Sequence, residues 1–268
     1  MPRRRLTVLA ATLGLSALAL TACSGGASSG TDTNAGSEYD LVTDGTLTVA
    51  TEGTYRPFSF HEGAGELTGF DVEIAEAVAE KLGLQVKFQE TQWDAIFAGL
   101  DAGRFDVIAN QVSINAERQE KYTFSSPYTV SRGVIVTDEG DDAISSFADL
   151  SGKTTAQSLT SNWYELATSS GAQVEAVEGW AQAVALLKQG RVDATVNDQL
   201  TYLDYEKTNS PTGLKIAAET EDTSESAFAF KKGQDTLADA VDGALEELRA
   251  DGTLAEISEK YFGADVTA

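Results

Sequence analysis

An internal duplication constrains the fold of this chain more than any other feature. The segment WDAIFAGLDAGRFDVIAN begins at Trp93, and WAQAVALLKQGRVDATVN begins 87 positions later at Trp180. Each segment is typical of a helix that ends at a glycine and continues into a short buried strand. The chain is therefore predicted to contain two units of like build. The shared positions are Trp93/Trp180, Leu100/Leu187, Gly103/Gly190, Arg104/Arg191, Asp106/Asp193 and Asn110/Asn197.

Hydrophobic periodicity predicts the order strand, helix, strand, helix, strand in both units. Short apolar strands that alternate with amphipathic helices are typical of an α/β fold with a parallel sheet. A further helix is predicted at 199–208, together with a helical tail at 236–262 whose position the periodicity does not reveal. The five elements are expected at 46–51, 70–82, 84–88, 94–102 and 105–110 in the first unit, and at 153–158, 162–169, 173–177, 180–189 and 192–197 in the second.

Polar residues follow the strands of both units. In an open parallel sheet, ligands bind in the crevice outside the carboxyl ends of the strands. Two such crevices that face each other would form one closed site between the units. The residues expected there include Glu52, Tyr55, Trp93, Asn110, Gln111 and Ser113 from the first unit, and Ser161, Asn162, Trp180, Asn197 and Asp198 from the second.

Arg118 follows this polar cluster and offers a fork of donors that fits a carboxylate. Ser113 and the backbone amides near Ser161 and Asn162 suit the same anion, and Asp198 would accept an ammonium group. Together these residues predict a clamp for an α-amino acid. Taken singly, each has an ordinary structural interpretation: Arg118 as a surface ion-pair partner, Asp198 as a helix cap, and the aromatic residues as core.

The N-terminus is predicted to be a targeting segment. Residues 1–22 have a basic start and an apolar stretch too short to span a bilayer comfortably, so they indicate an export signal. The sequence LTAC ending at Cys23 resembles the lipobox of bacterial lipoproteins, which implies a lipid anchor on Cys23. A free thiol beside an ordinary cleavage site is the alternative. Residues 23–43 are rich in Gly, Ser and Thr and are expected to form a flexible tether.

Charge and composition exclude several classes of function. The formal net charge of −23 argues against nucleic acid and against direct binding of anionic lipid, although it says little about a small ligand. A single cysteine excludes an intramolecular disulfide. With one cysteine and one histidine, neither a metal site nor thiol catalysis is expected, and no cofactor is predicted.

Between about 44 and 266 the chain closely resembles the polar amino acid substrate-binding proteins of bacterial ABC importers. The likeness rests on GTLTVATEGTYRPFSF, ELTGFDVEIAEAVAEKLG, ANQVSINAER, YTFSSPY and DGTLAEISEKYFGADVT, in that order. It implies a periplasmic-binding-protein-like α/β fold with two βαβ lobes joined by two crossing segments. Lobe 1 would comprise 44–132 and 225–268, and lobe 2 would comprise 133–224. It further implies an ABC permease as partner, a monomer, and a location on the extracytoplasmic face of the cell membrane.

The resemblance also implies roles for individual residues. Arg118 and Ser113 look like the carboxylate ligands, Ser161 like the contact from lobe 2 to the same group, and Asp198 like the ammonium ligand. Tyr55 and Trp93 look like the aromatic walls. The sequence NQVS at 110–113 is similar to NQVT of the cystine-binding branch, so cystine or a related sulfur amino acid is the expected ligand.

The chain departs from the family pattern in two places. Thr160 and Ser161 replace a common Gly-Thr, and Arg56 replaces a common proline, which places a new charge at the mouth of the cleft. These changes leave other polar ligands open, including glutamine, glutamate and basic amino acids.

The expected mechanism is capture by lobe closure, without chemistry. Two other functions remain open: a sensor subunit, and an enzyme resembling cyclohexadienyl dehydratase. The enzyme would need an acid in the cleft, for which Glu52 is the available carboxylate.

Overall fold

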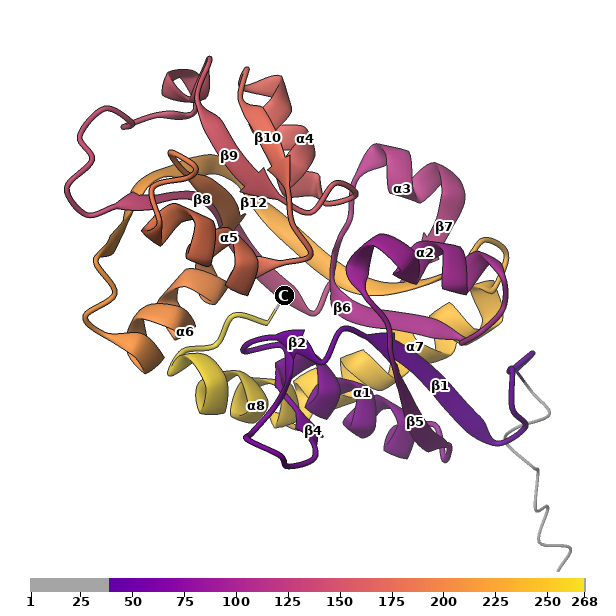
Figure 1. Cartoon of the computed structure of the whole chain (residues 1–268). Coiled ribbons are helices and arrows are strands. Elements are labelled where there is room, and N and C mark those ends of the chain that lie inside the picture. Colours follow the sequence, from indigo (N-terminus) through magenta and orange to yellow (C-terminus); the bar gives the residue numbers. More distant parts are fainter. Residues whose placement is uncertain (1–38, 268) are drawn as a thin grey trace, which may run out of the picture. The chain divides into compact units, whose positions relative to one another are not determined.

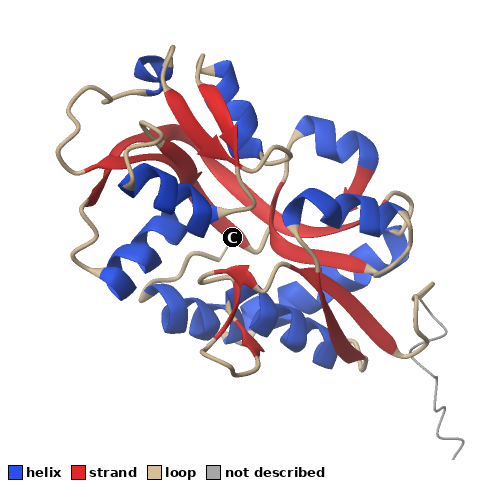
Figure 2. Ribbon diagram, in the orientation of Figure 1, coloured by secondary structure: helices blue, strands red, loops and turns tan. Residues whose placement is uncertain are grey.

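The computed structural model describes residues 39–267. The predicted signal peptide at 1–22, the lipid attachment site Cys23 and the tether as far as residue 38 lie outside the described residues. Within 39–267, no helix is long and apolar enough to cross a membrane. Helices and strands alternate along this part of the chain, which confirms the predicted α/β fold class (Figure 2).

The first unit, residues 46–113, has the predicted order of elements (Figure 1). β1 lies between β5 and β6 and runs parallel to both. All of β6 is buried, as is β1 after its first residue, which is typical of strands covered on both faces. The elements are β1 (Thr46–Thr51), α1 (Phe70–Lys81), β5 (Gln85–Glu90), α2 (Trp93–Asp101) and β6 (Val107–Ser113).

A small antiparallel sheet precedes α1, between residues 51 and 70, where no helix or strand was predicted. It is formed by β2 (Thr54–Tyr55), β3 (Ser59–His61) and β4 (Leu67–Thr68). Strands of two or three residues are too short to show a hydrophobic period, which is why the sequence did not reveal them. Gly69 then enters α1 with φ 135°, and a Cβ there would lie 2.2 Å from the carbonyl oxygen of Phe58. This tight turn therefore requires glycine.

The second unit, residues 154–209, repeats the first only in part. β9 and β10 pair in parallel as expected, but β11 pairs antiparallel with β8 (Thr129–Asp138), and a single parallel bridge between Thr155 and Ala194 joins it to β9. The expected parallel pairing on this side is thus reduced to one bridge, while the other edge of β11 has an antiparallel neighbour, as the other edge of β6 does. The elements are β9 (Thr154–Gln157), α4 (Asn162–Ser169), β10 (Gln173–Ala176), α5 (Trp180–Lys188), β11 (Thr195–Asp198) and α6 (Gln199–Asn209).

The duplicated residues make equivalent contacts in the two units. Gly103 and Gly190 both have φ 66°, the left-handed conformation that ends a helix. Asp106 Oδ2 accepts the backbone N–H of Thr48 at 2.7 Å, and Asp193 Oδ2 accepts that of Thr154 at 2.7 Å. Each aspartate thus ties the last strand of its unit to the first. The likeness of the two segments therefore extends from sequence to hydrogen bonding.

Two long antiparallel strands, β8 and β12 (Leu214–Lys231), join β11 of the second unit to the sheet of the first, whereas β9 and β10 form a separate two-stranded sheet. β12 pairs with both β8 and β6, so the strand order is β11-β8-β12-β6-β1-β5. Register shifts interrupt the β8–β12 pairing between Ile216 and Ala218 and between Glu219 and Thr223. The remaining elements before and between them are α3 (Ala116–Lys121), β7 (Tyr122–Phe124) and the 3₁₀ helix η2 (Phe147–Leu150).

The C-terminal tail packs on the first unit. α7 (Asp235–Ala250) and α8 (Thr253–Phe262) lie beside α1, shown in yellow and purple in Figure 1. Leu245 and Leu254 share a hydrophobic core with Phe70. This burial fixes a segment whose position the periodicity alone did not reveal.

The last described residues then cross to the start of β8. The backbone N–H of Val130 donates to the carbonyl oxygen of Val266 at 3.0 Å. The hydroxyl of Ser258 accepts the N–H of Val266 at 2.8 Å and donates to the carbonyl of Ala264 at 2.8 Å. The end of the chain is therefore held against the strand that connects the two units.

Candidate functional site

A cavity of about 360 Å³ lies where strand ends of the first unit face the second unit. This position is the one predicted from the carboxyl ends of the strands. Three of the residues predicted to bind ligand, Ser113, Arg118 and Asp198, are buried but are not part of the cavity wall. The predicted residues that do line it are Glu52, Tyr55, Trp93, Asn110, Gln111, Ser161, Asn162, Trp180 and Asn197.

Glu52, which is half-buried and follows β1, is hydrogen-bonded to Asn110, a buried residue of β6. Asn110 Nδ2 donates to Glu52 Oε2 at 2.7 Å, and Asn110 Oδ1 accepts the backbone N–H of Glu52 at 2.8 Å. Burial raises the pKa of Glu52 to about 7, opposed by the hydrogen bond from Asn110 and assisted by the charges of Asp94 and Glu178. At neutral pH this carboxyl can therefore be either charged or neutral, depending on what it contacts.

Gln111 is held in an uncommon conformation. Its φ of 48° lies in the left-handed region, which is rare for a residue with a side chain. Its backbone N–H donates to Asp71 Oδ2 at 2.7 Å, and its Nε2 donates to Asp71 Oδ1 at 2.7 Å. Burial raises the pKa of Asp71 to about 7. Asp71 thus fixes the amide of Gln111, whose Oε1 has no hydrogen-bond partner among the described residues.

The side chain of Arg118 lies over the ring of Trp93, and the residue is only 8% exposed. Its Nη1 donates to the carbonyl oxygen of Ser113 at 3.0 Å, and its Nη2 donates to that of Thr160 at 3.3 Å. The guanidinium carbon is 5.4 Å from the ring centre of Trp93. Burial lowers the pKa of Arg118, although the group stays charged. No carboxylate in the described chain lies within ion-pair distance of this side chain.

Asp198 caps α6, which was its alternative interpretation from the sequence. Its Oδ1 accepts the N–H of Leu200 at 2.8 Å, and its Oδ2 accepts the hydroxyl of Ser131. Burial raises its pKa to about 6. The residue before it, Asn197, lines the cavity and accepts the hydroxyl of Tyr55, so Asp198 follows a residue of the cavity wall directly in the chain.

Ser161 also has an internal role. Its hydroxyl accepts the N–H of Tyr164 at 3.0 Å and donates to the carbonyl of Ser158 at 2.8 Å, so it caps α4. Asn162 is the first residue of that helix. The start of α4 therefore forms part of the wall, as the sequence indicated.

A model of the family described as bacterial extracellular solute-binding proteins, family 3, matches residues 47–264. The chain belongs to this family. The predicted family resemblance is thereby confirmed. The probable amino-acid ABC transporter-binding protein of Haemophilus influenzae is 55% identical over 83% of this chain and 86% of its own. The L-cystine-binding protein TcyA of Bacillus subtilis is 49% identical over 97% of this chain and 98% of its own.

Solved structures of similar proteins have the same fold as this family 3 protein. An ancestral arginine-binding protein bound to arginine has a TM-score of 0.77 and 38% identity, with 82% of this chain and 99% of its own covered. This similarity confirms the predicted periplasmic-binding-protein-like fold. The two curated relatives are named as binding proteins rather than as enzymes.

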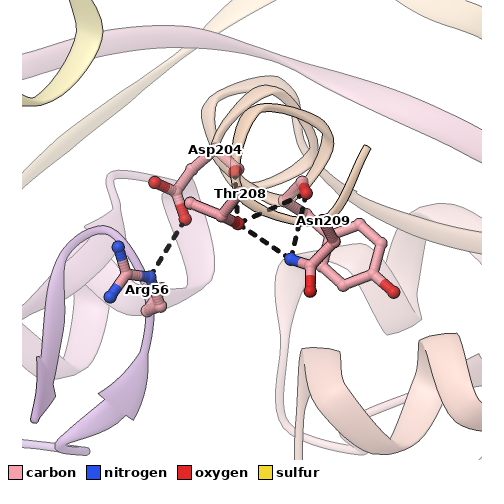
Figure 3. A network of polar contacts seen from close by, with 5 residues as sticks. Arg56, Asp204, Thr208 and Asn209 are labelled. Atoms are coloured by element: carbon pink, nitrogen blue, oxygen red, sulfur yellow. Dashed lines mark hydrogen bonds and ion pairs between the residues drawn. The ribbon is translucent and has the colours of Figure 1, made fainter. Parts of the chain in front are cut away.

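Several contacts in this family 3 protein connect the two units around the cavity. The hydroxyl of Tyr55 donates to Asn197 Oδ1 at 3.1 Å, and the hydroxyl of Thr160 donates to Asp94 Oδ1 at 2.7 Å. Outside the cavity, Arg56 pairs with a carboxylate of α6: its Nε lies 3.3 Å from Asp204 Oδ2 (Figure 3). These contacts depend on the two units lying together, so they stabilise the arrangement in which the cavity is formed.

Some residues of the cavity wall were not predicted from the sequence. Gln157 ends β9, and Trp163, Glu178 and Gln182 lie near the starts of α4 and α5. The predicted strand ended at residue 158, one residue after the true end of β9 at Gln157. A strand predicted to end at Gln157 would have placed this residue at the carboxyl end, where ligands bind. Among residues 39–267, no group of three or more His, Cys, Asp or Glu side chains is arranged to hold a metal ion.

Proposed function

We propose that this protein binds a polar amino acid outside the cytoplasm and delivers it to an ABC permease, with cystine or a related sulfur amino acid as the ligand. The observation that carries the proposal is Arg118, a buried guanidinium beside the cavity without a carboxylate partner in the described chain. A buried charge is costly unless it is paired. A ligand carboxylate would supply the missing charge.

The free donors of Arg118 suit that role. A guanidinium has five N–H donors. Two protein carbonyls, those of Ser113 and Thr160, accept from it. The remaining donors can form a bidentate pair with a carboxylate, which is the geometry that arginine favours. Asp198, a buried carboxyl group of the second unit, can accept the ammonium group of the same ligand.

The choice of cystine rests on similarity over the whole chain. The B. subtilis relative named as an L-cystine-binding protein aligns with 97% of this chain. The sequence NQVS at 110–113 agrees with the same branch, and two of its residues, Asn110 and Gln111, line the cavity. Binding of glutamine, glutamate or a basic amino acid is the alternative.

In the proposed mechanism, the lobes predicted at 44–132 with 225–268 and at 133–224 close over the ligand. Contacts such as Tyr55 to Asn197 form only when the lobes lie together, so ligand and protein contacts favour the same closed state. A lipid on Cys23 would hold the protein, as a monomer, at the extracytoplasmic face of the membrane, within reach of the permease.

The test is isothermal titration calorimetry of the full-length protein, which measures the dissociation constants of cystine, glutamine, glutamate and arginine. We expect cystine to bind most tightly and Arg118→Ala to remove measurable binding without a large change in thermal unfolding. Arg104→Ala is the matched control, because Arg104 is an exposed arginine away from the cavity wall. Unchanged affinity of Arg118→Ala would contradict the assignment.

A second function is favoured by one observation. The carboxyl of Glu52 lines the cavity and has a pKa of about 7, which suits a general acid or base at neutral pH. An enzyme that resembles cyclohexadienyl dehydratase would use such a group. Mass analysis after incubation with amino acids distinguishes the two functions, because a binding protein returns its ligand unchanged.

A further inference from the structure

We propose that the cavity contains a second recognition site for an α-amino acid group, formed by the start of α5, Gln157 and Glu52. The ligand would then carry one α-amino acid group at each end. This inference rests on the proposed function, because it assigns the second half of the same ligand. It concerns residues away from Arg118 and Asp198, which would hold the first half.

The anion side of this second site is the N-terminus of α5. The helix follows Gly179, which provides no side-chain cap, and its first backbone hydrogen bond comes from the N–H of Ala183 to the carbonyl of Gly179 at 3.1 Å. The N–H groups of Trp180, Ala181 and Gln182 therefore have no backbone partner in the described chain. All these residues line the cavity. Free N–H groups and the helix dipole make such an end favourable for a carboxylate.

Two side-chain donors on the same wall point to the same kind of ligand. Gln157 is 3% exposed, and its Nε2 has no hydrogen-bond partner among the described residues. The indole Nε1 of Trp180 is likewise buried and unpaired. Both residues line the cavity. Buried donors are nearly always satisfied in native proteins, so these two indicate an acceptor supplied by the ligand.

The cation side is Glu52, which reaches across from the first unit. Its Oε1 would lie 3.9 Å from a Cβ placed on Gly179, so the carboxylate lies next to the start of α5. Its Oε2 accepts from Asn110, whereas no protein donor or cation in the described chain contacts Oε1. The carboxylates of Asp94 and Glu178 add negative charge nearby. An ammonium group beside Glu52 would relieve this accumulation of charge.

The two sites together match one class of molecule. Arg118 with Asp198, and the start of α5 with Glu52, each combine an anion-binding and a cation-binding group. A compound with two α-amino acid groups, such as cystine, satisfies all four. An amino acid with one such group leaves the donors of Gln157 and Trp180 unpaired, which strongly disfavours its binding.

The experiment compares three probes by isothermal titration of the full-length protein: cystine, lanthionine and S-methylcysteine. Cystine and lanthionine have two α-amino acid groups, with and without a disulfide, and S-methylcysteine has one. We expect the first two to bind within about tenfold of each other and S-methylcysteine to bind at least about 100-fold more weakly, because several polar groups stay unpaired. Equal affinity for cystine and S-methylcysteine would overturn the second site and leave the proposed function standing.

Variants test the individual residues. Gln157→Leu and Trp180→Phe should each weaken cystine binding about 5- to 20-fold and leave S-methylcysteine binding unchanged. Gln189→Leu, an exposed position at the end of α5, is the control and should change neither. If Gln157→Leu does not fold, Trp180→Phe decides the question. Equal losses for both probes would refute the second site, whereas wild-type protein that binds none of the three probes would refute the proposed function as well.

Discussion

The ion pair between Arg56 and Asp204 should contribute to affinity although neither residue lines the cavity. Arg56 follows β2 in the first unit, and Asp204 belongs to α6 in the second (Figure 3). Their side chains are 43% and 10% exposed, and Nε lies 3.3 Å from Oδ2. Since the pair bridges the two units, separation of the units breaks it. Arg56→Ala should therefore favour the separated state and weaken ligand binding.

The size of the effect follows from the exposure of the pair. A partly exposed ion pair contributes about 0.2–1 kcal/mol, because water and salt screen it. The guanidinium of Arg56 also lies 3.8 Å from the ring centre of Phe60, but that contact is within the first unit and survives separation. Only the ion pair counts toward closure. Its loss corresponds to an affinity lower by roughly 1.4- to 5-fold.

The assay is titration with cystine at low and high salt. Wild-type affinity should fall at high salt by about the same factor, because screening weakens the pair, and Arg56→Ala should depend less on salt. The double exchange of Arg56→Asp with Asp204→Arg should recover part of the loss. Lys215→Ala is the control, since it breaks the exposed pair between Lys215 and Asp142 at 3.0 Å, and both residues lie in the lobe predicted at 133–224. Equal affinity and equal salt dependence of wild type and Arg56→Ala would refute the reasoning.

Three further predictions concern pH, packing and hydrogen bonding. Burial raises the pKa of Glu52 to about 7 in the free protein, and a ligand ammonium would lower it, so affinity should decrease below pH 7 by up to about tenfold per pH unit. Titrations from pH 5 to 8 should show this decrease for wild type, whereas Glu52→Gln should keep its affinity down to about pH 6, where Asp198, with a pKa of about 6, begins to lose its charge. Gly99→Ala should lower the free energy of unfolding by about 1–3 kcal/mol, because the new Cβ would lie 2.6 Å from Phe105 Cζ. Gly243→Ala is the matched control: its Cβ would meet open space in α7, so it should raise the free energy of unfolding by about 0.5–1 kcal/mol. Chemical denaturation measures both, and a stabilising effect of Gly99→Ala would contradict the packing. Asp106→Ala should lower the free energy of unfolding by about 3 kcal/mol in the same assay, because two backbone N–H groups at 2.7 Å lose their charged acceptor. A decrease below about 0.5 kcal/mol would show that these hydrogen bonds contribute little to stability.

Local signals in the sequence were sufficient for the elements and the duplication. Gly103 and Gly190 end their helices in the left-handed conformation that only glycine adopts at low cost, so these boundaries could be predicted from the chain alone. The pairing of β11 could not, because its neighbour β8 is distant in sequence and the choice between the edges of a strand depends on tertiary contacts. Elements were therefore predicted better than their arrangement.

The candidate site shows the same limit. The rule of strand ends brought Glu52, Asn110 and Gln111 to the cavity, because backbone direction alone places them. It did not show that Asp198 caps α6, since both uses of an aspartate have the same sequence pattern. Nor does any sequence pattern reveal that the donor of Gln157 is unpaired, because that requires knowledge of every neighbouring acceptor.

The anchoring of the last residues beside β8 offers a way to observe the protein at work. A dye attached to a cysteine introduced at position 267 would sit next to Val266, whose carbonyl accepts from Val130. Its surroundings would change as the connecting strands flex, while the cavity itself stays unmodified. Since Cys23 is the only native cysteine, replacing it leaves one thiol for labelling. Such a labelled protein would be a fluorescent sensor for its own ligand.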